Sequence, residues 1–80
     1  MIAYFSRGIA LESRRQYFAA ITDYEHVTRL QPSNAVAWNS RCWTRAIVGQ
    51  LQPALSDCNE ALRLRPEYAN ALDSRAFVHL

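Results

Sequence analysis

The sequence predicts an all-α fold of antiparallel helix pairs that repeat along the chain and stack into an α-solenoid of about five helices. Three observations predict this fold. The 80-residue chain matches itself at one fixed spacing. Apolar residues recur at steps of three and four, which is the period of one helix face. Prolines stand at the same place in two successive repeats, where each helix pair would end.

The self-match has a spacing of 34 residues and needs no gap. The stretch Arg29-Leu30-Gln31-Pro32 falls on the stretch Arg63-Leu64-Arg65-Pro66. A period of this length is typical of arrays in which each repeat is one helix–turn–helix unit. The single residues that coincide are Ala3, Ala37 and Ala71; Ser6, Ser40 and Ser74; Arg7, Arg41 and Arg75; Gln16 and Gln50; Ala20 and Ala54; and Asp23 and Asp57.

The local signals place two helices in each repeat. Pro32 and Pro66 disfavour helix at the residue before them, so a helix pair ends at each. Ser33 and Asn34 are suited to cap the helix that follows, and Pro53 is tolerated in the first turn of a helix. The helices expected are 2–14, 17–30, 35–48, 53–64 and 69–79.

With these features the chain resembles the tetratricopeptide repeat family over its whole length. The resemblance implies one domain, 1–80, with full repeats at 1–34 and 35–68, and with 69–80 as the first helix of a third repeat or a terminal helix. It also implies a right-handed superhelix. The residues that carry the resemblance are large residues early in each first helix (Tyr4, Trp38, Leu72), small residues where paired helices approach (Gly8, Cys42, Ala76), small residues that open each second helix (Ala20, Ala54), and the closing prolines (Pro32, Pro66).

One departure from the family pattern concerns the turn inside the first repeat. The second repeat has Gly49 in this turn, whereas the first repeat has Arg15. If the turn needs a left-handed residue, Arg15 costs about 1 kcal/mol relative to glycine.

The charge and hydropathy patterns exclude two classes of partner. Nine basic residues, all arginines, stand against seven acidic ones, and the arginines are scattered along the chain, so we expect no nucleic-acid surface. No apolar run reaches the ~20 residues that span a membrane, so we expect no membrane insertion. The N-terminal residues lack a signal-peptide layout, and we expect a cytoplasmic protein.

The residue types of catalytic and metal sites are spread apart. His26 and His79 fall in different repeats, and His26 is expected on a solvent-exposed helix face with no nucleophile beside it. Cys42 and Cys58 lack the spacing of a zinc site, so we expect two buried, reduced thiols. The sequence therefore predicts no catalytic residue, no metal site and no cofactor, in a chain that is not an enzyme.

A second face of the first helices is a candidate binding surface, because each helix buries only one stripe against its partner. In the resembled family this face lines the concave groove in which peptides bind. Packing between neighbouring repeats is the alternative for these residues. Asn39 alone has a type suited to clamping a C-terminal carboxylate, so we expect no such clamp. The predicted groove residues are Phe5, Ile9, Asn39, Trp43, Ile47, Asp73 and Phe77.

These patterns predict a scaffold that binds a protein, a peptide or a partner helix in an apolar groove. One alternative is a repeat segment that recruits the substrate of a larger enzyme. Another is self-assembly: the segment 69–80 presents Leu72 and Ala76 without a following helix, so we expect a truncated chain that forms a homodimer through its C-terminal helix.

The arginines that recur at each first helix have a second expected role. Arg7 and Arg41 lie one residue before the close-contact position, and Asp23 and Asp57 recur in register on the second helices. We therefore expect one Arg–Asp ion pair inside each repeat, favoured by the planar guanidinium fork.

Overall fold

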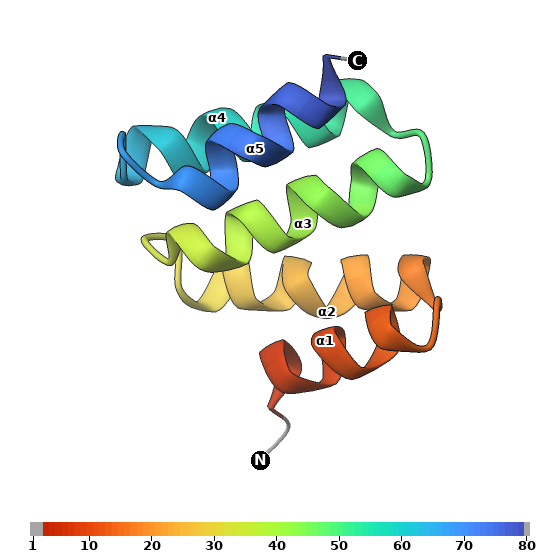
Figure 1. The fold of residues 1–80 in the computed structure, drawn as a ribbon. Coiled ribbons are helices and arrows are strands. Elements are labelled where there is room, and N and C mark those ends of the chain that lie inside the picture. Colours follow the sequence, from red (N-terminus) through yellow and green to blue (C-terminus); the bar gives the residue numbers. More distant parts are fainter. Residues whose placement is uncertain (1–2, 80) are drawn as a thin grey trace.

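A computed structural model describes residues 3–79, and in this part of the chain it contains five α-helices and no strand (Figure 1). The all-α prediction is thus confirmed. The handedness of a longer superhelix stays a prediction. The helices are α1 (Tyr4–Ser13), α2 (Tyr17–Leu30), α3 (Ala35–Ile47), α4 (Leu51–Leu64) and α5 (Ala69–Val78).

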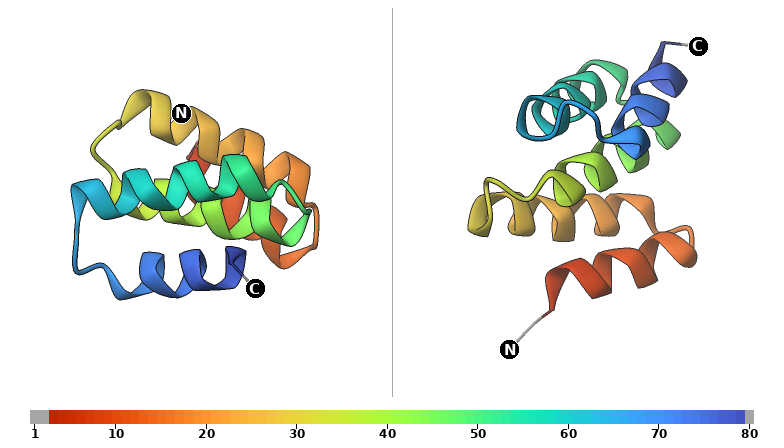
Figure 2. Two further views of the ribbon diagram at one scale, coloured as in Figure 1. Left: turned by 90° about the horizontal axis from the view of Figure 1, so that it is seen from above. Right: turned by 60° about the vertical axis from the view of Figure 1, so that its left-hand side comes forward.

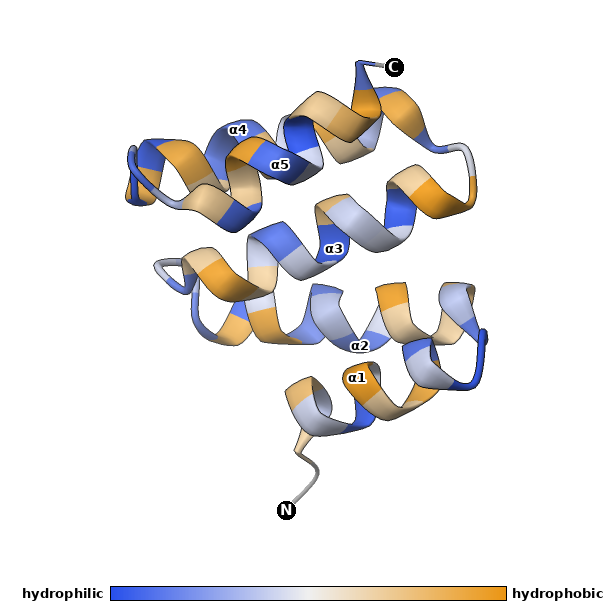
Figure 3. Ribbon diagram, viewed as in Figure 1, coloured by the Kyte–Doolittle hydropathy of each residue, from blue (hydrophilic) through white to orange (hydrophobic). Residues whose placement is uncertain are grey.

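The helices stack in chain order, and consecutive helices run in opposite directions (Figures 1 and 2). Helix α1 packs on α2, α2 on α3, and α3 on α4, while α5 contacts both α4 and α3. Figure 3 shows apolar and polar segments alternating along the helices, as expected for helices with one buried side. The first helix of one predicted repeat therefore lies beside the second helix of the preceding one.

The helix ends agree with the sequence prediction to within one residue, with two exceptions. The start expected at residue 2 lies outside the described residues. Helix α4 begins at Leu51, two residues before the expected position. Pro53 does not prevent this earlier start, because the first N–H groups of a helix have no intrahelical partner for it to remove.

The turns explain the cap and glycine signals in the sequence. Asn34 caps α3, since its Oδ1 accepts a hydrogen bond from the Ala37 N–H at 3.2 Å. Gly49 has a φ of 86°, and Arg15 has a φ of 60° in the matching turn of the first repeat. Both turns thus need a left-handed residue, and Arg15 occupies one without being glycine.

Small residues allow the helices to approach closely in the core. Gly8 is buried on α1, and a Cβ added there would lie 2.6 Å from Tyr24 Cε1. Tyr24 is itself only 1% exposed. A glycine at this point of α1 therefore makes room for a tyrosine ring on α2. The core residues with no exposed surface are Ala20, Ala37, Cys42, Ala54, Cys58, Ala61 and Ala71.

The prediction of reduced thiols is wrong for this structure. Cys42 on α3 and Cys58 on α4 form a disulfide, with their Cα atoms 5.4 Å apart. The small-residue position of α3 brings it close enough to α4 for this bond, because a disulfide needs Cα atoms within about 7 Å. Disulfides are rare in reducing compartments. The expectation of a cytoplasmic location loses this support and stays a prediction.

Candidate functional site

The two predicted ion pairs are present. Arg7 Nε and Nη2 donate to the two carboxylate oxygens of Asp23 at 2.8 and 2.9 Å. Arg41 Nε and Nη2 donate to those of Asp57 at 3.0 and 2.8 Å. The hydrogen bond from Arg7 lowers the pKa of Asp23 below its usual range and thus outweighs the opposing effect of burial. In each repeat a bidentate arginine–aspartate salt bridge therefore connects the first helix to the second.

The pair in the second repeat is part of a larger buried network. Arg45 Nη1 also donates to Asp57, at 2.9 Å, and the sequence reasoning missed this partner because Arg45 does not recur at the 34-residue spacing. Arg41 Nη1 further donates to Thr28 Oγ1 on α2 at 3.4 Å, and its guanidinium lies over the Trp38 ring at 5.0 Å. Arg41 thus connects the two repeats as well as the two helices of its own repeat.

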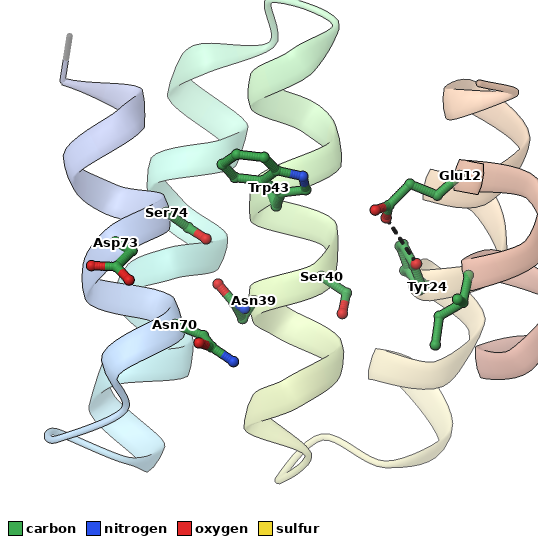
Figure 4. A pocket seen from close by; sticks show the side chains of 9 residues that line it. Glu12, Tyr24, Asn39, Ser40, Trp43, Asn70, Asp73 and Ser74 are labelled. Atoms are coloured by element: carbon green, nitrogen blue, oxygen red, sulfur yellow. Dashed lines mark hydrogen bonds between the residues drawn. The ribbon is translucent and has the colours of Figure 1, made fainter. Parts of the chain in front are cut away.

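A hollow of about 280 Å³ lies across the first helices of the predicted repeats. Figure 4 shows that its walls come from three places: the side chains of α3 lie in the middle, those of α5 on one side, and Glu12 and Tyr24 on the other. We call this the interhelical hollow. It is lined by Ile9, Glu12, Tyr24, Asn39, Ser40, Trp43, Asn70, Asp73 and Ser74.

Four of the seven predicted groove residues line this hollow: Ile9, Asn39, Trp43 and Asp73. Phe77 adjoins them, since its ring packs on Trp43 with centroids 4.9 Å apart.

Two predicted groove residues lie elsewhere. The ring of Phe5 packs against Tyr24 at 5.9 Å, and Phe5 lines a separate hollow at the start of α1. Ile47 is 37% exposed at the end of α3. Whether the seven residues bind a ligand stays a prediction.

The sequence is similar to known proteins that contain helical repeats. No family model matches the sequence. A tetratricopeptide repeat-containing thioredoxin, TTL4, of Arabidopsis thaliana is 36% identical over 69 residues, which cover 84% of this chain and 10% of that protein. The human mitochondrial import receptor subunit TOM70 is 28% identical over 76 residues, or 95% of this chain and 12% of the relative. The chain belongs to the tetratricopeptide repeat family. It spans about a tenth of the length of these curated relatives.

In this tetratricopeptide repeat chain, the polar lining of the hollow is the part that sequence reasoning missed. The Tyr24 hydroxyl donates to Glu12 Oε1 at 3.0 Å. Thr44 Oγ1 lies 2.9 Å from the same oxygen and 2.8 Å from the Ser40 carbonyl, so its one proton is shared between these two acceptors. Burial and the Glu12 carboxylate raise the pKa of Tyr24 far above its usual range, so this hydroxyl remains a donor. The helical period contained the signal, because Glu12 follows Ile9 by three residues on α1.

Asn39 on α3 adds an unpaired group to the lining of the hollow. Its Oδ1 is buried and has no hydrogen-bond partner among the described residues. A buried carbonyl without a donor is unfavourable, and a donor supplied by a ligand would satisfy it. The interhelical hollow is therefore polar as well as aromatic, which differs from the apolar groove expected from the sequence.

His26 differs from its expected position. Its ring stacks on Tyr4 with centroids 4.4 Å apart, so it is partly buried instead of standing on a solvated face. The stacking follows from the contact between α1 and α2, which bring these rings together.

Within residues 3–79 there is no group of three or more His, Cys, Asp and Glu residues able to hold a metal ion. None of the described helices is long and apolar enough to cross a membrane.

A second hollow, of about 480 Å³, follows α4. It is lined by four consecutive residues, 65–68, and Arg65 lies over the Tyr68 ring at 4.5 Å. Its lining comes from the turn between α4 and α5 alone. The interhelical hollow is the better candidate, because its lining comes from four helices.

Proposed function

We propose that this chain is a protein-interaction module that binds a peptide or a partner helix in the interhelical hollow. The observation that carries the proposal is the exposed aromatic pair of Trp43 and Phe77, which are 38% and 41% exposed although their rings pack on each other. Aromatic anchors beside a pocket are frequent hot spots of protein interfaces.

The surroundings of this pair support the same function. Ile9 on α1 is 47% exposed and shares the hollow with Trp43 on α3. The hollow, of about 280 Å³, is slightly smaller than the usual small-molecule pocket, and it suits single side chains of a polypeptide better than a large cofactor. Its walls belong to different repeats, so an extended segment laid across them would contact all three first helices.

The proposal is tested by selecting peptides and then removing the aromatic pair. A phage-displayed random dodecapeptide library is selected on the wild-type chain, and the affinities of the recovered peptides are measured by fluorescence anisotropy. Trp43→Ala and Phe77→Ala are each expected to weaken binding about tenfold or more. Far-UV circular dichroism checks that each variant stays folded.

Phe18→Ala is the matched control, because Phe18 is a 65% exposed aromatic residue on α2 and does not line the hollow. It is expected to leave peptide binding unchanged. Recovery of no peptide whose binding depends on Trp43, or an equal loss with Phe18→Ala, would overturn the proposal.

A second candidate function is a recruiting segment within a larger protein that carries another domain. The Arabidopsis relative is a tetratricopeptide repeat-containing thioredoxin, and this similarity favours the candidate. The same hollow would serve here to bring a polypeptide to the other domain. The full-length reading frame distinguishes the two functions, since a catalytic domain encoded beside these repeats would favour the second.

A further inference from the structure

Two acidic side chains without a salt bridge line the interhelical hollow. Of its seven acidic residues, four form salt bridges with arginines: Asp23, Glu25, Asp57 and Glu60. The other three, Glu12, Asp73 and Glu67, have no salt-bridge partner within residues 3–79, and two of them, Glu12 and Asp73, line the hollow. None of the nine lining residues is basic.

The two carboxylates stand on opposite walls. Glu12 belongs to α1 and Asp73 to α5, with the side chains of α3 between them (Figure 4). Glu12 Oε1 accepts a hydrogen bond from the Tyr24 hydroxyl and lies within hydrogen-bond distance of the Thr44 hydroxyl, which it shares with the Ser40 carbonyl. A carboxylate held in one orientation before binding loses little entropy when it meets a cation.

The groups between the carboxylates also favour a donor-rich ligand. Asn39 Oδ1 is a buried acceptor without a partner within the described residues. Trp43 and Phe77 are partly exposed, and aromatic rings attract guanidinium and ammonium groups. Acceptors, negative charge and aromatic faces together match an arginine or lysine side chain.

We propose that the partner of the interhelical hollow is a basic peptide segment, whose arginine or lysine side chains face Glu12 and Asp73 while a neighbouring apolar residue contacts Trp43 and Phe77. This inference rests on the proposed function and names the chemistry of the partner. It is opposite in sign to a clamp for a C-terminal carboxylate, because the hollow offers negative charge where such a clamp needs positive charge.

The test uses the peptide selection described above and adds charge variants. The wild-type chain is expected to recover sequences enriched in arginine and lysine over the starting library. Glu12→Gln and Asp73→Asn are each expected to weaken the recovered peptides about threefold, and together about tenfold. Replacing the arginine of a recovered peptide by citrulline, a neutral isostere, is expected to remove the difference between wild type and the double variant.

Two features keep the test decisive. Asp73→Asn alters an exposed residue with no salt bridge within residues 3–79, so its result holds even if Glu12→Gln disturbs the Tyr24 and Thr44 hydroxyls. Glu67→Gln removes the same charge away from the hollow, and it is expected to leave affinity unchanged.

The outcomes separate the two proposals. Recovered peptides that are neutral or acidic, and that still depend on Trp43, would overturn the basic-peptide inference and leave the proposed function standing. A loss of affinity with Glu67→Gln equal to that with Asp73→Asn would also overturn the inference, because it would reflect the overall charge alone. Recovery of no Trp43-dependent peptide would overturn both.

Discussion

Gly8 on α1 lies against the ring of Tyr24 on α2 so closely that a Cβ at Gly8 would meet Tyr24 Cε1 at 2.6 Å and Cδ1 at 2.9 Å. Tyr24 is almost completely buried, so its ring has little room to move. This contact sets how closely the first two helices pack. It also reverses the usual preference for alanine over glycine inside a helix.

Gly8→Ala is expected to lower the free energy of unfolding by up to about 2 kcal/mol. Overpacking a core costs roughly 1–3 kcal/mol, and the better helix propensity of alanine offsets up to about 1 kcal/mol of that. Urea denaturation followed by circular dichroism measures the change. In a Tyr24→Leu background the same substitution is expected to be neutral or stabilising, because the ring is gone. A Gly8→Ala variant that is more stable than wild type would contradict the packing argument.

The left-handed turn residues give a second prediction. Arg15 and Gly49 occupy matching turns with positive φ. Arg15→Gly is expected to raise the free energy of unfolding by about 0.5–1 kcal/mol, and Gly49→Ala to lower it by about 1 kcal/mol. Arg14→Gly serves as the control, since Arg14 has a φ of −90° and gains nothing from glycine. Equal effects of glycine at positions 14 and 15 in thermal melts would disprove the assignment of strain to Arg15.

The features that recur at the 34-residue spacing could be predicted from the sequence. The Arg7–Asp23 and Arg41–Asp57 pairs are of this kind, because both partners return in register and the helix pairing then brings them together. The alignment of Arg15 with Gly49 likewise indicated a position where the turn could need a left-handed residue, and both residues have a positive φ. Residues that recur at the same spacing in the sequence can therefore be used to predict contacts within each repeat.

Features that occur once could not be predicted in this way. Arg45 joins Asp57 without an equivalent in the first repeat. The disulfide depends on the distance between α3 and α4 at one point, and a separation of 16 residues in the sequence does not reveal it. The polar lining is also of this kind, because the position 34 residues after Glu12 is an alanine and Glu12 meets Thr44 only through the contact between repeats. Self-association through α5 stays a prediction, although Leu72 is 42% exposed there.

The disulfide gives a third prediction. Breaking the Cys42–Cys58 bond with dithiothreitol is expected to lower the free energy of unfolding by about 2–3 kcal/mol, because the bond closes a short loop and restricts the unfolded chain. Denaturation curves with and without the reductant measure the effect, and intact mass shows the gain of two hydrogens. The Cys42→Ala/Cys58→Ala variant is the control and should not respond to the reductant. A non-reduced sample that already has the mass of the free dithiol would show that the bond does not form in solution.

The fourth prediction is the acid sensitivity of the Arg7–Asp23 pair. The hydrogen bond from Arg7 lowers the pKa of Asp23 in the folded chain, so the unfolded chain binds a proton at a higher pH than the folded one. The stability from this pair is therefore present above the ordinary aspartate pKa of about 4, and it is lost as the pH falls through the lower folded-state value.

Asp23→Asn is expected to cost about 1–2 kcal/mol of unfolding free energy at pH 7, a modest value because the exposed Arg7 end of the pair is screened by solvent. The cost is expected to shrink as the pH approaches about 3. Urea denaturation at a series of pH values measures this, with Glu67→Gln as a control that has no salt-bridge partner within residues 3–79. A difference between Asp23→Asn and wild type that stays constant from neutral to acid pH would show that the carboxylate charge does not stabilise the fold.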